Sequence, residues 1–210
     1  MHRPTFAVVA GLSIVLLAAC SASTPSASSL AASSTSATST PSPTAAISAS
    51  AAPTAAPTTL DPCKLVTSDE VSKLTGTTFG PGDASTTENN DKLCSYGQEG
   101  LVFEVLVAVA PDAATAKNDE PAFKAQLEQA ISQAGPTDLT LTELPDFEPG
   151  VDAAVLSGSV TVAGQKITAI ALYALKGAVL VALSDVAVGG SVPTSAAMQA
   201  QARVTLGRLP

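Results

Sequence analysis

The chain contains no tryptophan and only one histidine, His2, and these absences exclude several kinds of chemistry. His2 lies in a segment that we expect to be removed on export, so the mature chain cannot run a Ser-His-Asp or Cys-His mechanism. No Ser-x-x-Lys nucleophile, glycine-rich phosphate loop, zinc spacing or EF-hand loop is present. We therefore expect a protein that is not an enzyme and holds no cofactor and no metal.

Basic residues are scarce as well. Beyond residue 59 there are nine lysines and arginines against eighteen acidic residues, a net charge of −9. Because an acidic surface repels phosphate groups, we expect no binding to nucleic acid and no direct docking on anionic lipid headgroups.

The first twenty residues have the three parts of an export signal. Arg3 lies in a short polar start, an apolar run spans residues 6–17, and small residues follow it. The apolar run is too short to cross a bilayer, which takes about 20 residues. The ending Leu17-Ala18-Ala19-Cys20 resembles the lipobox of bacterial lipoproteins. This resemblance implies cleavage before Cys20 and a diacylglyceryl thioether on Cys20, which anchors the protein to the extracytoplasmic face of the cell membrane. An ordinary cleavable signal that happens to contain a cysteine is the alternative.

Residues 21–59 are almost entirely serine, threonine, alanine and proline, with Leu30 and Ile47 as the exceptions. Such a segment has too little apolar bulk to offset the entropy of ordering it, so we expect a disordered stalk. The remaining residues, 60–210, are enough for one independent extracytoplasmic domain, which we expect to be a monomer.

Capping signals predict the first and last helices of this domain. Thr67 and Glu70 form a capping-box pattern, and Gly76 ends the helix. The segment 80–91 is polar and rich in turn residues, which predicts a mobile loop. Near the C-terminus, Pro193-Thr194 precedes a helix whose buried stripe is formed by Met198, Ala202, Leu206 and Leu209.

Strands dominate the middle of the domain. The apolar run 101–110 predicts a central strand, and residues 139–144, 153–162, 166–175 and 178–186 predict four more, the last three joined by short turns as antiparallel hairpins. Because of Pro121, we expect the helix between them to start near Asp119 or Glu120 and to end at Gly135. One side of this helix is apolar, with Phe123, Leu127, Ala130, Ile131 and Ala134. The fold class is therefore α+β, an antiparallel sheet with about three packed helices.

Cys63 and Cys94 remain once Cys20 carries lipid. Two cysteines in an exported domain favour a disulfide, with free buried thiols as the alternative. A metal site with two cysteines is disfavoured because the mature chain has no histidine.

The motif Asp61-Pro62-Cys63-Lys64-Leu65-Val66-Thr67, followed by Glu70-Val71 and Leu74-Thr75-Gly76, resembles the opening of an actinobacterial lipoprotein family. This family is the domain-of-unknown-function 3558 family. Cys94-Ser95-Tyr96 resembles the family's second cysteine and the aromatic residue after it, although that residue is usually tryptophan. The resemblance is specific over residues 61–97 and loose beyond residue 101. It implies an exported, disulfide-bearing α+β domain and carries no catalytic residues across.

Two sets of side chains remain as candidate sites. Four carboxylates surround the prolines of residues 143–152, namely Glu143, Asp146, Glu148 and Asp152. They could bind calcium or hydrolyse a glycoside, but a solvated loop is the favoured interpretation. Among the few aromatic residues, we expect Phe103 and Phe123 in the core and Tyr96 packed on the disulfide.

The leading functional hypothesis is a membrane-tethered surface module that binds a protein or another component of the cell envelope, without catalysis. A carrier that holds a small molecule or lipid in a cavity between the sheet and its helices is the main alternative. A hydrolase that uses the carboxylates near Asp146 is the least favoured hypothesis.

Overall fold

The computed structural model describes residues 60–133 and 137–210. The predictions for the signal peptide, for lipidation of Cys20 and for the stalk fall outside these residues. None of the described helices is long and apolar enough to cross a membrane.

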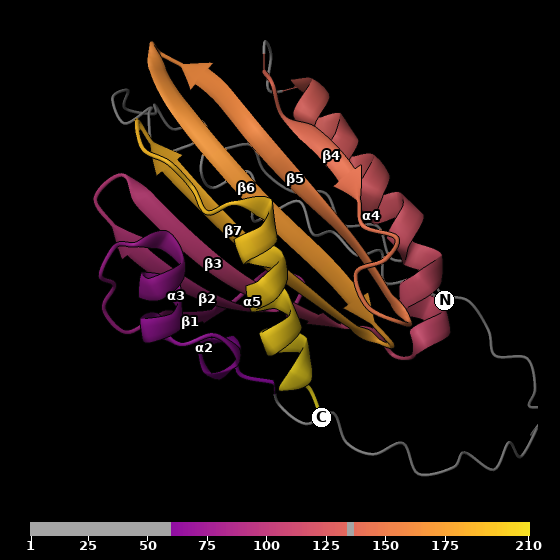
Figure 1. Cartoon of the computed structure of the whole chain (residues 1–210). Coiled ribbons are helices and arrows are strands. Elements are labelled where there is room, and N and C mark those ends of the chain that lie inside the picture. The colour runs from indigo at the N-terminus through magenta and orange to yellow at the C-terminus, as the bar shows by residue number, and fades with distance from the viewer. Residues whose placement is uncertain (1–59, 134–136) are drawn as a thin grey trace, which may run out of the picture.

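Seven antiparallel strands form a single sheet in the order β1-β2-β3-β7-β6-β5-β4 (Figure 1). The strands are β1 Asp83–Thr86, β2 Lys92–Gln98, β3 Leu101–Val109, β4 Thr140–Glu143, β5 Val151–Val162, β6 Gln165–Lys176 and β7 Val179–Val188. The three long C-terminal strands, β5 to β7, are joined by tight turns, as predicted. The prediction of an α+β fold with an antiparallel sheet is confirmed.

Four helices accompany the sheet in the described part of the chain: α2 Pro62–Leu65, α3 Ser68–Thr75, α4 Ala113–Gln133 and α5 Ser195–Gly207. Helices α2, α3 and α5 pack on one side of the sheet, and α4 lies on the other (Figure 1). Adjacent residues of β6 show the division, because neighbours along a strand point to opposite faces. Leu172 lies in one cluster with Met198 of α5, whereas Tyr173 packs against Phe123 of α4. We call these faces the α5 side and the α4 side.

Local signals set the ends of α3 and α5 as the sequence predicts. The Thr67 side chain accepts the N–H of Glu70, and the Glu70 carboxylate accepts the N–H of Thr67 at 2.9 Å, which completes the capping box. Gly76 ends α3 in the left-handed conformation at φ 75°, which glycine adopts without strain. Thr194 caps α5 by accepting the N–H of Ala197.

The prediction of a mobile loop over residues 80–91 is wrong for its middle part. β1 occupies Asp83–Thr86 and pairs with β2, for example Ala84 with Cys94. All four residues of β1 are exposed, so this edge strand has no alternation of apolar and polar residues for a sequence pattern to detect. Gly82 precedes it at a close approach, because a Cβ there would lie 2.7 Å from the Tyr96 ring.

The predicted start of the second helix is also wrong. α4 begins at Ala113, well before Pro121, because the Asp112 side chain accepts the N–H of Thr115 at 2.8 Å and caps the helix there. Pro121 leaves the carbonyl of Lys117 without its helical partner, but both residues are exposed, so water can replace the lost bond. The predicted side chains at 130, 131 and 134 fall outside those that the structure describes.

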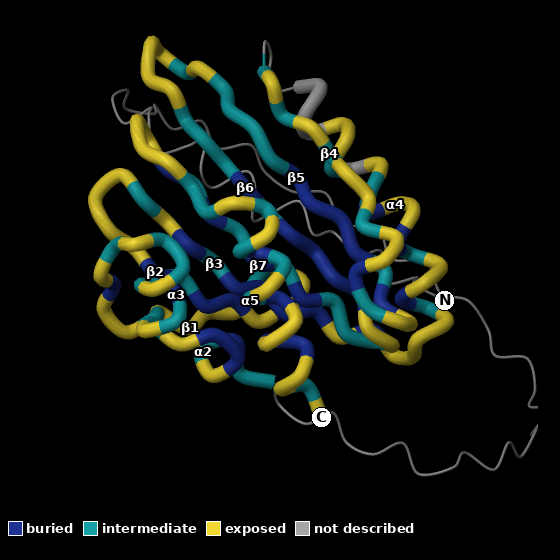
Figure 2. Tube along the Cα trace, in the orientation of Figure 1, coloured by how far each residue is buried: buried dark blue, intermediate teal, exposed yellow. Residues whose placement is uncertain are grey.

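The main core lies on the α5 side, where buried residues follow the middle of the strands in Figure 2. Its largest fully buried side chains include Phe103, Leu172, Leu183, Met198 and Leu206. The structure joins Cys63 and Cys94 by a disulfide, as the sequence predicts, and so ties α2 to β2. The three buried residues of the predicted stripe on α5, Met198, Ala202 and Leu206, all belong to this core.

Candidate binding groove

The carboxylates singled out in the sequence are divided between ion pairs and an open loop. Asp152 pairs with Lys117 at 2.7 Å, and Glu143 pairs with Lys124 at 2.9 Å. Asp146 and Glu148 lie in the loop that precedes β5, where Asp146 is exposed. The described residues contain no group of three or more side chains arranged to hold a metal ion. Two of the four carboxylates therefore already have lysine partners.

The aromatic residues are buried where the sequence places them. Phe103 is fully buried on the α5 side, with its ring 6.4 Å from that of Tyr96. Tyr96 belongs to the same cluster as Cys94 and donates a hydrogen bond to the Val66 carbonyl. Phe123 is buried on the α4 side, edge-on to Tyr173 at 5.0 Å between ring centres. None of these four rings is an exposed platform for a ligand.

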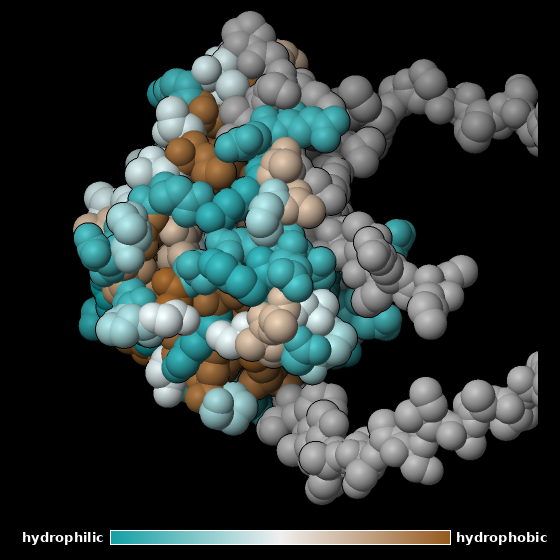
Figure 3. Space-filling model, turned by 90° about the vertical axis from the view of Figure 1, so that its right-hand side faces the viewer, coloured by the Kyte–Doolittle hydropathy of each residue, from teal (hydrophilic) through white to brown (hydrophobic). Residues whose placement is uncertain are grey.

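The described part of the chain has an apolar groove on the α4 side, which the sequence analysis did not locate. Phe123 and Leu127 of α4 form one wall, and residues of β2 and β3, including Leu93 and Leu106, form the other. The floor includes four small side chains on β6 and β7: Ala169, Ala171, Ala182 and Ser184. The groove encloses about 110 Å³. Figure 3 views the molecule from the right-hand side of Figure 1, where α4 and β4 lie, and hydrophobic residues appear there between hydrophilic ones.

Strand register creates the hollow. Ala171 lies opposite Ser184, so two small residues of neighbouring strands meet on one face, and the small Ala169 lies two residues away on the same face. Large side chains at these places would fill the space between the sheet and α4, as Tyr173 does nearby against Phe123. No single segment of the sequence contains this arrangement.

Glu104 is the acidic side chain of the groove lining. It lies opposite Ser184 of β7 and Ser95 of β2, and the Ser95 hydroxyl donates to its Oε1 at 3.2 Å. Burial raises the pKa of the Glu104 carboxyl above its usual value, and the bond from Ser95 partly opposes this rise. Among the described residues, no lysine or arginine forms a salt bridge with Glu104.

Ion pairs hold α4 on this side of the sheet. Lys124 of α4 pairs with Glu143 of β4 at 2.9 Å, and Lys117 of α4 pairs with Asp152 of β5 at 2.7 Å. Lys124 also pairs at 2.9 Å with the nearly buried Glu120 of the same helix. Burial lowers the pKa of Lys124, but the hydrogen bonds to the carboxylates of Glu120 and Glu143 outweigh it and raise the pKa above its usual value. Burial raises the pKa of neighbouring Tyr173 to about 12, so this phenol stays neutral. The helix that walls the groove is therefore attached by ion pairs as well as by the apolar contacts of Ala116 and Phe123.

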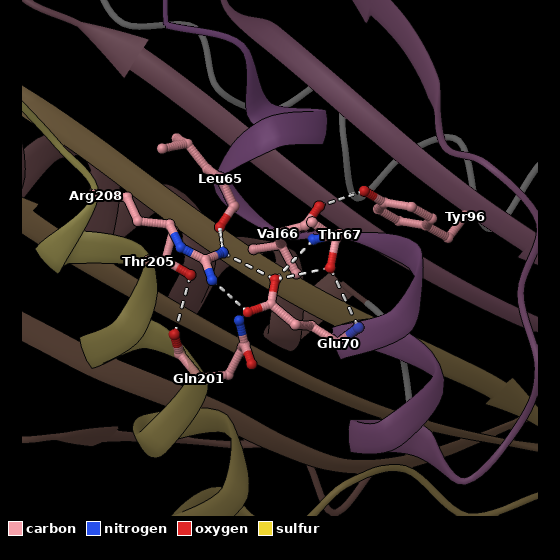
Figure 4. Close-up of polar contacts among 8 residues, drawn as sticks. All are labelled: Leu65, Val66, Thr67, Glu70, Tyr96, Gln201, Thr205 and Arg208. Carbon is pink, nitrogen blue, oxygen red and sulfur yellow. Dashed lines mark hydrogen bonds and ion pairs between the residues drawn. The ribbon is translucent and has the colours of Figure 1, made fainter.

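Polar contacts close the α5 side instead (Figure 4). Arg208 donates to the Leu65 carbonyl at 2.6 Å and to both oxygens of Glu70. The bond from Arg208 is the main reason that the pKa of Glu70 falls to about 2. These contacts join the C-terminal end of α5 to α2 and α3.

Asp185 is a second acidic residue that the sequence analysis did not single out. It is fully buried on the α5 side, between Phe103 and Ile170, and neither carboxylate oxygen makes a hydrogen bond of normal geometry with a described residue. Burial raises its pKa to about 7. One signal could have revealed both acids: Glu104 is the only charged residue of β3, and Asp185 is the only charged residue of β7.

The architecture is thus an antiparallel sheet with a disulfide-linked side and a grooved side, an α+β domain whose candidate binding site lies on the α4 side. The family model described as "Protein of unknown function (DUF3558)" matches residues 15–190, so the chain belongs to this family. No curated protein and no solved structure matches the chain.

Proposed function

We propose that this protein is a lipid-anchored surface module that binds a partner in the cell envelope, without catalysis, through the groove on the α4 side. The observation that carries the proposal is the groove itself, an apolar hollow whose lining includes a carboxylate, Glu104, that no described cation pairs. Ligand sites are typically concave and mostly apolar, with a few polar groups that set orientation.

The proposed location rests on the N-terminal sequence. The segment 17–20 has the order of a lipobox, and the family match begins at residue 15, so it includes Cys20. In this proposal, signal cleavage leaves Cys20 as the first residue with its lipid, and residues 21–59 form a stalk that lifts the domain from the membrane. An actinobacterial origin is part of the same proposal.

Replacement of Cys20 tests the anchor. In the full chain made by a bacterial host, Cys20→Ala should release the protein from the membrane fraction, because it removes the lipid and the apolar segment 6–17 is by itself too short to span the membrane. A Ser23→Ala variant is a matched control that should stay membrane-bound. Equal membrane retention of both variants would refute the lipid anchor.

Cavity size favours a binding module over a carrier. A hollow of about 110 Å³ is smaller than the roughly 300–1,000 Å³ of typical small-molecule sites, and is comparable to cavities that hold one ring. It can take one apolar side chain or a short part of a larger molecule. The carrier stays the second candidate because the groove is almost wholly apolar. A native mass spectrum of the purified full chain with added mass that leaves on denaturation would favour the carrier.

Site-specific photo-cross-linking in living cells tests the binding function. A photo-reactive residue replaces Val102, an exposed residue that shares the face of Glu104, in the full chain. The matched position is Val204, exposed on α5. We expect a discrete adduct from position 102 that disappears when Ala171→Phe fills the groove, and no such adduct from position 204. Adducts that form equally at both positions, or that survive Ala171→Phe, would refute the proposed site.

A further inference from the structure

The groove combines apolar walls with one acidic group that no described cation pairs. The Ser95 hydroxyl bonds Oε1 of Glu104, and no described residue bonds the second oxygen, Oε2. The side chains that line the groove include no lysine or arginine. Lys124 lies near Tyr173, but Glu120 and Glu143 already hold its ammonium group.

A carboxylate in such a place has one complementary kind of partner. An ionised group that is partly withdrawn from water is stabilised by an opposite charge that donates hydrogen bonds to it. The net charge of −9 beyond residue 59 acts in the same direction, because it attracts cationic partners over a longer range. The occupant of the groove should therefore carry an apolar group and, beside it, a positive charge.

The surroundings of the groove favour a protein as this occupant. The hollow of about 110 Å³ takes one side chain, and apolar surface continues beyond it on the same face. Val102 and Val188 lie on this continuation and are 37% and 42% exposed. A small amine would leave this surface in water, whereas a protein segment that crosses the sheet would cover it.

We infer that the groove binds a segment of a partner protein in which an apolar side chain stands next to a lysine or arginine. The apolar side chain fills the hollow between α4 and the alanines of β6 and β7, and the cation pairs with Glu104. This inference rests on the proposed function, since it names the chemistry of the partner that the groove would bind.

Selection of displayed peptides tests the inference without knowledge of the partner. The full chain, purified in detergent, is used to select from a library of random heptapeptides. The same selection is made with three variants: Glu104→Gln, Ala171→Phe, which fills the groove, and Val204→Phe, which adds the same ring on α5 as a control. Thermal unfolding establishes that each variant is folded.

We expect the wild type and Val204→Phe to enrich peptides with leucine, isoleucine or phenylalanine next to lysine or arginine. Ala171→Phe should enrich none of them. Glu104→Gln should still select peptides with apolar residues but should lose the preference for lysine or arginine. Its Kd for a peptide enriched by the wild type should rise about 5–10-fold, as for the loss of one partly screened ion pair.

A second measurement uses only the wild-type chain. Replacement of the peptide's lysine by norleucine removes the charge and keeps the apolar stem, so it should weaken binding by the same factor, and binding of the lysine peptide should weaken with added salt. Apolar peptides without a basic preference in the wild type would overturn the inference while the proposed function stands. Equal enrichment by the wild type and Ala171→Phe would overturn both.

Discussion

The two sides of the sheet are packed differently. The α5 side carries three helices, a disulfide and a continuous core of nineteen buried residues, and Arg208 closes it at the C-terminal end of α5. The α4 side carries one helix, and its buried residues fall into three small separate clusters. The difference indicates that stability comes mainly from the α5 side.

The size of the side chains also differs between the α5 side and the α4 side of the sheet. On the α5 side, β3, β6 and β7 present Phe103, Leu172 and Leu183, which fill the space beneath the helices. On the α4 side, β6 and β7 present larger residues such as Tyr173 together with alanines and Ser184, and these small residues leave a hollow. A domain that needed only stability would gain from larger residues there, because each filled methylene contributes roughly 0.8 kcal/mol. The open side is thus the one available for binding.

Replacement of one phenylalanine on each side should give the largest difference in the free energy of unfolding between the two sides. We expect Phe103→Ala to lower the free energy of unfolding by about 3–5 kcal/mol, because it leaves a cavity in the closed core. Phe123→Ala should cost less, about 3 kcal/mol or below, because this ring already borders the open groove and its removal leaves a less enclosed cavity. Urea unfolding of both variants measures the two costs. Equal losses of stability would contradict the conclusion that stability comes mainly from the α5 side.

Removal of the disulfide should destabilise the domain by a similar amount without touching the groove. Cys63 and Cys94 are 31 residues apart, and the chain-entropy model gives about 3.5–4 kcal/mol for a loop of that length. The Cys63→Ala/Cys94→Ala double variant should lose this stability in urea unfolding. At urea concentrations below its unfolding midpoint, the double variant should bind a selected peptide as the wild type does. Loss of peptide binding in the still folded variant would show that the two sides are not separate.

Asp185 should make the closed side sensitive to pH. Its pKa is raised from about 3.8 in the unfolded chain to about 7 in the fold, so between these values the folded state binds more protons than the unfolded state. Stability therefore falls as pH rises through this window, by about 2–3 kcal/mol from pH 5 to pH 8. Urea unfolding across this range measures the slope, and Asp185→Asn should remove most of it. Glu104→Gln, on the open side, should change the slope less. A slope unaltered by Asp185→Asn would contradict the assignment.

The smallest effect should come from the ion pairs that hold α4. Lys124→Met removes both pairs of this lysine and should cost about 1 kcal/mol, reduced by added salt, because the lysine is partly exposed. Lys64→Met is the matched control, since Lys64 is 85% exposed and pairs only loosely with Asp61 at 3.6 Å. Thermal unfolding at low and high salt distinguishes the two. A cost for Lys124→Met as small as that of the control would mean that the ion pairs of Lys124 do not help to hold α4.

Sequence reasoning succeeded where one local signal decides the structure. Thr67 and Gly76 mark the ends of α3 through their own hydrogen bonds and backbone angles, and the spacing of Met198 and Ala202 marks the buried face of α5. It failed where the deciding contact comes from elsewhere in the chain. β1 is a strand because it pairs with β2, and its own residues are all exposed.

The groove could not be predicted for the same reason. Its floor depends on the register that sets Ala171 against Ser184, and its wall depends on where α4 packs. The sequence does contain one usable sign, a lone acidic residue in an otherwise apolar strand, and Glu104 satisfies it. However, Asp185 satisfies it equally and lies on the closed side, so only the fold distinguishes the two acids.

Cysteine labelling on intact cells tests the division between the two sides most directly. Val102→Cys reports on the open side and Val204→Cys on the closed side, and the two valines have similar exposure, 37% and 47%. The rate of reaction with a membrane-impermeant maleimide is measured on cells and on the purified full chain. If a partner covers the groove, Val102→Cys should react at least several-fold more slowly on cells, while Val204→Cys reacts at the same rate in both. Equal slowing at the two positions, or slowing at Val204→Cys alone, would contradict the account.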